Sequence, residues 1–244
     1  MKFFTQISTA DIFRKAQKVD TPLDGLKTDV DNPYMAAVEA DDMKTAQKMV
    51  DEAAREAGYT YGPVWHAGSG AFNTFKRRYE RDKVNSAAEA ARRGRFGKGI
   101  FFSDEKDVAG GFGSVNRRFF LRMNFPVEHN LGGASYYDGA LHDPETGEAY
   151  LDDDGKPMRV DQDFLPDEAA ELHLDDTGKY NTGVIVRGVY ESIPSKDHPK
   201  PMSDIYVVGN PNQIKSADPV TYDDQKKPIP LEKRFDSSNS DIRY

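Results

Sequence analysis

The chain has 244 residues, a length that predicts one large domain or one domain with appendages, because domains average roughly 150 residues. Acidic residues (41) outnumber basic ones (33), and the formal net charge of −8 disfavours general nucleic-acid binding, because the chain as a whole repels a phosphate backbone. Cysteine is absent, which excludes disulfides, thiolate metal sites and cysteine nucleophiles.

The first quarter of the chain predicts an arm, then helices, then a strand. Residues 1–30 lack the apolar run of a signal peptide, and no stretch of the chain approaches the roughly 18 apolar residues of a membrane span, so we expect a soluble, cytoplasmic protein with an N-terminal arm. Over residues 33–57, apolar side chains recur at steps of three and four, which predicts one or two amphipathic helices ending at Gly58. Residues 61–66 then favour a short strand that runs into a glycine-rich loop.

Two segments of opposite charge flank the middle of the chain. Nine basic and three acidic residues lie between Lys76 and Lys98, and fourteen acidic and two basic residues lie between Asp138 and Asp176. Such runs are typical of solvated surfaces. The alternative for the basic run is a rim around a site for an anionic ligand.

The remaining elements follow in order. The sequence predicts a helix over 77–93, strands over 100–102 and 117–123 with a helical turn between them, and a helix over 167–176. Residues 130–165 are rich in Gly, Asp and Pro and predict a long loop that adds little core, and the acidic insertion as a whole is placed at 130–178.

The C-terminal part predicts two strands and a tail. Residues 182–190 form the most strand-like segment of the chain, and 204–208 predict a second strand before a Gly-Asn-Pro turn. Residues 216–244 contain turn residues and few apolar ones, so we expect an extended tail that lies over the body or is partly disordered.

Several common catalytic patterns are missing. The five histidines include no pair at the spacing of three or four residues that places two metal ligands on one helix face, so no metal site is predicted. The sequence also lacks a P-loop, a complete dinucleotide-binding glycine motif and the Gly-x-Ser-x-Gly turn of serine hydrolases.

Three strings nevertheless match a known pattern. Trp65-His66-Ala-Gly-Ser-Gly is followed by Gly97-Lys-Gly-Ile-Phe101-Phe102, and Phe112 lies eleven positions after Phe101. Together these strings resemble the ADP-ribosyltransferase superfamily of the diphtheria-toxin and poly(ADP-ribose) polymerase type. The strings NPYMAAVEADDMKTAQKM, KYNTGVIVRGV and NPNQIKSADPVTYDD resemble, more narrowly, the ADP-ribosyltransferase domain of phage and mobile-element polyvalent proteins.

The resemblance implies a fold and a domain organisation. The fold would be α+β, a split β-sandwich of two small antiparallel sheets with flanking helices and with NAD in the cleft between them. The domain would span residues 31–215 and include the acidic insertion 130–178, with the arm 1–30 before it and the tail 216–244 after it.

The resemblance also implies an NAD site. His66 would bind the ribose hydroxyls, the backbone after it would pair with the nicotinamide carboxamide, and Phe101 and Phe112 would stack on the nicotinamide ring. Arg95, or one of its basic neighbours Arg92, Arg93 and Lys98, would meet the pyrophosphate. The residues assigned to NAD binding are His66, Ala67, Gly68, Ser69, Arg95, Phe101, Phe102 and Phe112.

The third catalytic position departs from the family pattern. Relatives carry a Glu at the start of the late strand, eight residues before a Gln, and the position eight residues before Gln213 holds Ile205. Asp204 is one position early and would face away from the site unless a bulge re-aims it, because adjacent side chains of a strand point to opposite faces. Three alternatives remain: transfer without the Glu, binding without transfer, or a register in which Asp204 or Gln213 takes its role.

The resemblance implies an NAD-dependent mono-ADP-ribosyltransferase that uses NAD as co-substrate and no metal. A phage or mobile-element origin would place its action in the bacterial cytoplasm, on a host macromolecule that is protein in preference to nucleic acid. The alternative from another class is a non-catalytic module that binds NAD or ADP-ribose or serves as a virion-associated interaction domain.

Overall fold

The computed structural model describes residues 31–76, 99–136, 138–174, 181–191 and 200–244. The N-terminal arm, the helix predicted over 77–93 and the basic residues Arg92, Arg93, Arg95 and Lys98 lie outside these residues. None of the helices in the described part of the chain has the length and apolar character needed to cross a bilayer.

Two N-terminal helices form where the apolar spacing predicts them. Helix α2 spans Asp31–Glu39 and α3 spans Met43–Glu56. The side chain of Asp42 caps α3 by accepting a hydrogen bond from the backbone N–H of Thr45 at 3.1 Å. Gly58 follows the end of α3 in the left-handed region, at φ +86°, so the predicted end of the helical region is confirmed.

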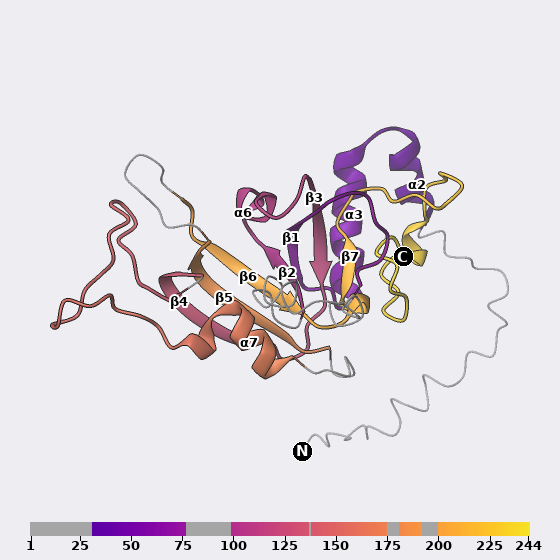
Figure 1. Ribbon diagram of the computed structural model, residues 1–244. Helices are drawn as coiled ribbons and strands as arrows, with labels where there is room; N and C mark the ends of the chain where they lie inside the picture. The colour runs from indigo at the N-terminus through magenta and orange to yellow at the C-terminus, as the bar shows by residue number, and fades with distance from the viewer. Residues whose placement is uncertain (1–30, 77–98, 137, 175–180, 192–199) are drawn as a thin grey trace, which may run out of the picture.

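Seven strands form one mixed sheet in the order β4-β5-β6-β2-β1-β3-β7 (Figure 1). Their bounds are β1 Tyr61–Gly68, β2 Ile100–Ser103, β3 Val115–Leu121, β4 Val127–Ser135, β5 Gly183–Tyr190, β6 Ser203–Val208 and β7 Ile214–Ser216. Short helices α6 (Lys106–Gly110) and α7 (Pro166–His173) and three 3₁₀ turns, Gln162–Phe164, Pro211–Gln213 and Leu231–Lys233, complete the described elements. The chain is therefore α+β, as the sequence predicts.

The sheet differs in two ways from the expected pair of antiparallel sheets. Its two halves are continuous, although only one residue pair, Trp65 with Ser103, joins β1 to β2. In addition, β4 and β5 pair in parallel. The parallel pair arises because the chain crosses from the end of β4 to the start of β5 through a long segment that contains α7, whereas a tight turn would have produced an antiparallel pair.

The segment 130–165, expected to add little core, does contribute to it, because Leu131, Ala134 and Tyr136 are buried in a core cluster. Leu165, Ala169, Ala170 and Leu174 are buried in a cluster with the valines of β5 and with Ile205. Helix α7 thus covers one face of β5 and β6 (Figure 1). The expectation for 130–165 was wrong because its first residues complete strand β4, which pairs with β5 and buries Leu131 and Ala134.

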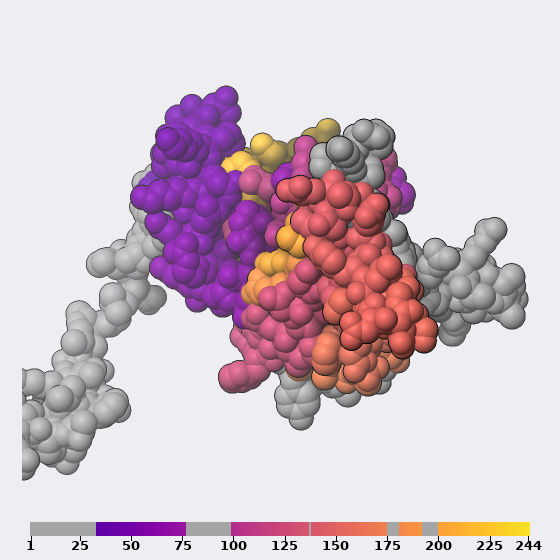
Figure 2. All heavy atoms as spheres, turned by 90° about the vertical axis from the view of Figure 1, so that its left-hand side faces the viewer, coloured from indigo at the N-terminus to yellow at the C-terminus, as the bar shows by residue number. Residues whose placement is uncertain are grey.

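The rest of the acidic segment projects from the body as an irregular hairpin (Figure 1). Isolated bridges hold its arms together, such as Ala140 with Arg159 and Leu151 with Pro157. Seen from the side of this hairpin, the N-terminal helices and the acidic segment lie on opposite flanks of the molecule (Figure 2).

The C-terminal segment 216–244 lies over the body and is anchored there. Its residues Ile229, Leu231, Phe235 and Ile242 are buried. The Arg234 guanidinium, itself buried, donates hydrogen bonds to the backbone oxygens of Ser216, Asp218 and Pro219 and to the Tyr34 hydroxyl, at 2.9–3.4 Å.

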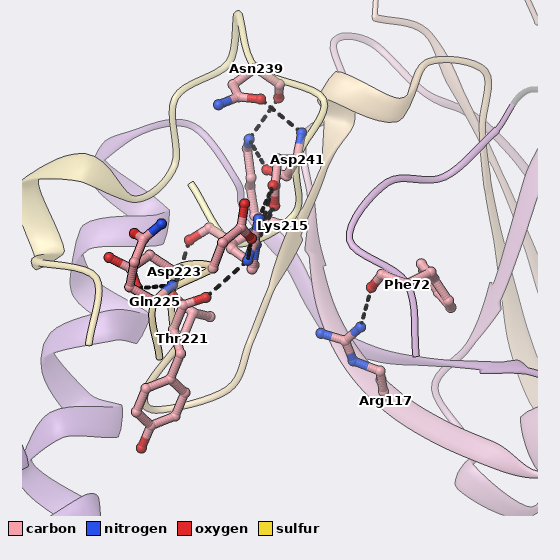
Figure 3. Close-up of polar contacts among 11 residues, drawn as sticks. Phe72, Arg117, Lys215, Thr221, Asp223, Gln225, Asn239 and Asp241 are labelled. Carbon is pink, nitrogen blue, oxygen red and sulfur yellow. Dashed lines mark hydrogen bonds and ion pairs between the residues drawn. The ribbon is translucent and has the colours of Figure 1, made fainter. Parts of the chain in front are cut away.

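A second buried cation, Lys215, holds the same segment. Its Nζ donates hydrogen bonds to the backbone oxygens of Asn239 at 2.7 Å and Asp241 at 3.0 Å (Figure 3). Burial lowers the pKa of Lys215 to about 8 from its usual 10.5. Because a neutral amine still carries two N–H groups, both hydrogen bonds persist after deprotonation.

We expect the free energy of unfolding to depend on pH through Lys215. Between pH 8 and pH 10 the unfolded chain holds the lysine proton and the folded chain releases it, so the folded state gains stability as the pH rises. Denaturant titrations of the native chain and of Lys215→Met at pH 8, 9 and 10 would measure this effect. The free energy of unfolding of the native chain, relative to that of Lys215→Met, should increase as the pH rises. A difference between the two that is constant with pH would contradict this expectation.

Candidate active site

A cavity of about 870 Å³ opens where β1 and β2 part. Its wall is formed by the end of β1, the loop 69–76, strand β2 and the residues of and after α6. Tyr136, Glu191 and Ile205 complete it from the other half of the sheet. The single pairing between β1 and β2 leaves room for this cavity, because strands paired along their length would close it.

His66 is part of this wall and is held by a hydrogen bond to β2. Its Nδ1 lies 2.7 Å from the backbone oxygen of Phe101. Since a carbonyl oxygen only accepts, Nδ1 is the donor, and Nε2 of the neutral ring is then the acceptor. The ring is packed among four aromatic rings at centroid distances of 4.9–6.4 Å, those of Phe72, Phe75, Phe102 and Phe119.

The loop after β1 is fixed by two contacts. The Arg117 guanidinium donates to the backbone oxygen of Phe72 at 2.7 Å (Figure 3) and lies over the rings of Phe72 and Phe119, 5.5 Å from each centroid. Gly113 packs directly on Gly68, since a Cβ at Gly113 would lie 2.7 Å from the Gly68 backbone. Ala67, Gly68 and Ser69 all line the cavity.

The three predicted aromatic residues also line the cavity, in different ways. Phe101 is half-buried and packs on the core cluster beneath α7. Phe102, the next residue of β2, is buried on the side of His66. Phe112 follows α6 and remains 47% exposed, so its ring is accessible at the cavity. The structure therefore brings His66, Phe101 and Phe112 to one cavity.

The late strand presents Ile205, and not Asp204, to this cavity. Ile205 is buried there, whereas the Asp204 carboxylate accepts hydrogen bonds from Arg187 Nη1 at 2.7 Å and from the Gly188 N–H at 3.1 Å. Asp204 is thus engaged on the opposite face of β6, as strand alternation predicts.

Gln213 also lies away from the lining of the cavity. It is buried beneath the turn before β7, where Oε1 accepts from the Asn210 N–H and Nε2 donates to the backbone oxygens of Arg122 and Thr182, each at 2.9 Å. These contacts give Gln213 a structural role. Neither Asp204 nor Gln213, the two residues that the sequence suggests for the role of the missing Glu, lines the cavity.

Two polar residues of the lining, Tyr136 and Glu191, were not predicted. Tyr136 follows β4, and its hydroxyl donates to Asp167 Oδ1 at 3.2 Å. Glu191 follows β5, and its Oε2 is buried. No motif marks either residue; the only sequence signal is that each follows a strand.

Comparison with protein-family models, with curated proteins and with solved structures gives no match to this chain. Within the described residues, no group of three or more His, Asp or Glu side chains is placed to hold a metal ion. The candidate site is thus defined by the cavity and its lining residues.

Proposed function

We propose that the protein is an NAD-dependent mono-ADP-ribosyltransferase. The observation that supports this most is the cavity shared by His66, Phe101 and Phe112, three residues that the sequence resemblance assigns to one NAD site. The volume of about 870 Å³ is within the range of small-molecule pockets, roughly 300–1,000 Å³.

The geometry fits the demands of the reaction. Cleavage of the bond between nicotinamide and the ribose passes through a state with positive charge on the sugar, so the site must hold the ring, orient the ribose and stabilise that charge. Phe101 and Phe112 supply aromatic surface for the nicotinamide ring, and the backbone at Ala67 and Gly68 pairs with its carboxamide. His66 Nε2, an acceptor in the tautomer set by Phe101, receives a hydrogen bond from a ribose hydroxyl.

The acceptor, in this proposal, is a macromolecule of a bacterial host, protein in preference to nucleic acid, and the protein acts in the bacterial cytoplasm after expression from a phage or mobile element. These features come from the sequence resemblance. The net charge of −8 agrees with an acceptor other than nucleic acid.

A second candidate function is a module that binds NAD or ADP-ribose without transferring it. The specific observation in its favour is the buried Ile205, which places an apolar side chain where the superfamily that the sequence resembles carries a catalytic carboxylate. Such a module would bind NAD in a calorimetric titration and leave it intact.

Incubation with NAD labelled in its adenylate part, in the presence of a bacterial lysate, tests the proposal. We expect release of nicotinamide and transfer of label to a macromolecule that protease digestion converts to small fragments. Binding of NAD without nicotinamide release would support the binding module instead. Absence of both binding and release would overturn both candidates.

A further inference from the structure

One carboxylate is present among the described residues that line the cavity, that of Glu191. Lys76 supplies the one Lys or Arg side chain among those residues. A carboxylate near the ribose has a clear use, since it stabilises developing positive charge on the sugar and accepts a proton from the attacking group. Ile205 supplies neither function.

The position of Glu191 depends on a bulge in β5. Val186 pairs with Ile205 of β6 and Val189 pairs with Ser203, so Arg187 and Gly188 together face the single residue between them, Asp204. Gly188 has φ +68°, in the left-handed region that glycine adopts readily.

The bulge decides which face of the sheet Glu191 occupies. Val186 and Val189 both pack in the core cluster that contains Ile205, although they are three positions apart. With strict alternation, residues 186 and 191 would point to opposite faces. The extra residue reverses this parity after Gly188, so that Glu191 lies on the face of Val189 and Ile205 and reaches the cavity.

Asp204 holds the bulge in place. Its carboxylate bridges the two residues of the bulge, accepting from Arg187 Nη1 at 2.7 Å and from the Gly188 N–H at 3.1 Å. Arg187 is in turn paired with Glu128 of β4 at 3.0 Å, which ties the bulge to the neighbouring strand. Asp204 thus fixes the backbone conformation that directs Glu191 toward the cavity.

We propose that Glu191 is the catalytic carboxylate of this cavity and that Asp204 is its positioning residue; this assignment rests on the function proposed above. In the reaction, the bond between the ribose C1′ and the nicotinamide nitrogen breaks and its electron pair leaves with nicotinamide. A bond then forms from C1′ to the nucleophilic atom of the acceptor or of water. The proton of that nucleophile passes to the Glu191 carboxylate and from there to solvent.

The test is nicotinamide release and NAD binding, measured by chromatography and calorimetry on the full chain. Glu191→Gln keeps the shape of the side chain and removes its charge. We expect its kcat to fall about 100-fold or more, with NAD affinity close to that of the wild type, because a group that acts on the transition state affects kcat more than binding. The matched control is Glu148→Gln in the exposed projecting hairpin, which should retain wild-type kcat.

Asp204 variants test the positioning role. Asp204→Ala removes the acceptor of the Gly188 N–H and should lower kcat with little change in the KM for NAD. Asp204→Asn retains an oxygen acceptor and should recover most of the lost kcat. A residue that only stabilised the fold would lower the thermal midpoint without this split between kcat and KM.

The two proposals fail in distinguishable ways. A wild-type protein that releases no nicotinamide overturns the proposed function, and with it the roles proposed for Glu191 and Asp204. A wild-type protein that is active, with Glu191→Gln equally active, overturns the role of Glu191 alone. Full activity of Asp204→Ala overturns the positioning role of Asp204.

Discussion

Replacement of His66 by alanine is expected to reduce nicotinamide release about 100-fold or more. The variant removes the Nε2 acceptor that we propose for the ribose, and orienting hydrogen bonds of this kind typically contribute factors of about 10²–10³. It also empties a position surrounded by four phenylalanine rings, so NAD affinity should fall together with the rate. Initial rates at saturating NAD and a calorimetric titration would measure both quantities.

His173→Ala is the matched control for this experiment. His173 lies exposed at the end of α7 and does not line the cavity, so the variant should keep the wild-type rate. Removal of the His66 ring from among four phenylalanine rings is also expected to lower the stability of the fold. His66→Gln is therefore a second variant, with a smaller loss of volume and a polar side chain. Wild-type rates in both His66 variants would remove His66 from the proposed mechanism.

Replacement of Arg234 by methionine is expected to lower the free energy of unfolding by about 3 kcal/mol, the scale seen when one member of a buried charged network is removed. The variant removes a donor from four oxygens, three backbone oxygens of residues 216–219 and the Tyr34 hydroxyl, although the Pro219 oxygen keeps the hydrogen bond from the Tyr34 hydroxyl at 3.0 Å. For a chain of this length, the thermal midpoint should fall by roughly 6–12 °C.

Lys233→Met, at the exposed neighbouring position, is the control and should leave the free energy of unfolding within about 0.5 kcal/mol of the native value. Denaturant titration followed by far-UV circular dichroism would compare the three proteins. Equal stability of Arg234→Met and Lys233→Met would show that the buried guanidinium does not anchor the C-terminal segment.

The local elements were largely predictable from sequence because each has a pattern that acts over a few residues. Apolar spacing indicated α3, and the β-branched run at 183–190 indicated β5. The core contribution of the C-terminal segment was not predictable, because Ile229, Leu231, Phe235 and Ile242 are separated by turn residues and follow no period. Their burial depends on where the segment lies, which is a tertiary property.

The candidate site likewise contains residues that the sequence could indicate and one that it could not. His66, Phe101 and Phe112 were singled out by the sequence resemblance, and the structure brings them to one cavity. Glu191 was not, since its face of the sheet is set by one extra residue at Gly188, and alternation counted along the sequence places it on the wrong side. Bulges depend on pairing with a neighbouring strand, so no local pattern reveals them.

The C-terminal segment has a consequence for when the cavity can form. Thr74, in the loop that lines the cavity, forms a bridge with Asp241, and the Ile242 N–H donates to the backbone oxygen of Asn73 at 2.8 Å. Ile242 also packs in the phenylalanine cluster beside His66. During synthesis, residues 241 and 242 must leave the ribosome before they can brace the pocket loop, so we expect the cavity to form only after the C-terminal segment has emerged.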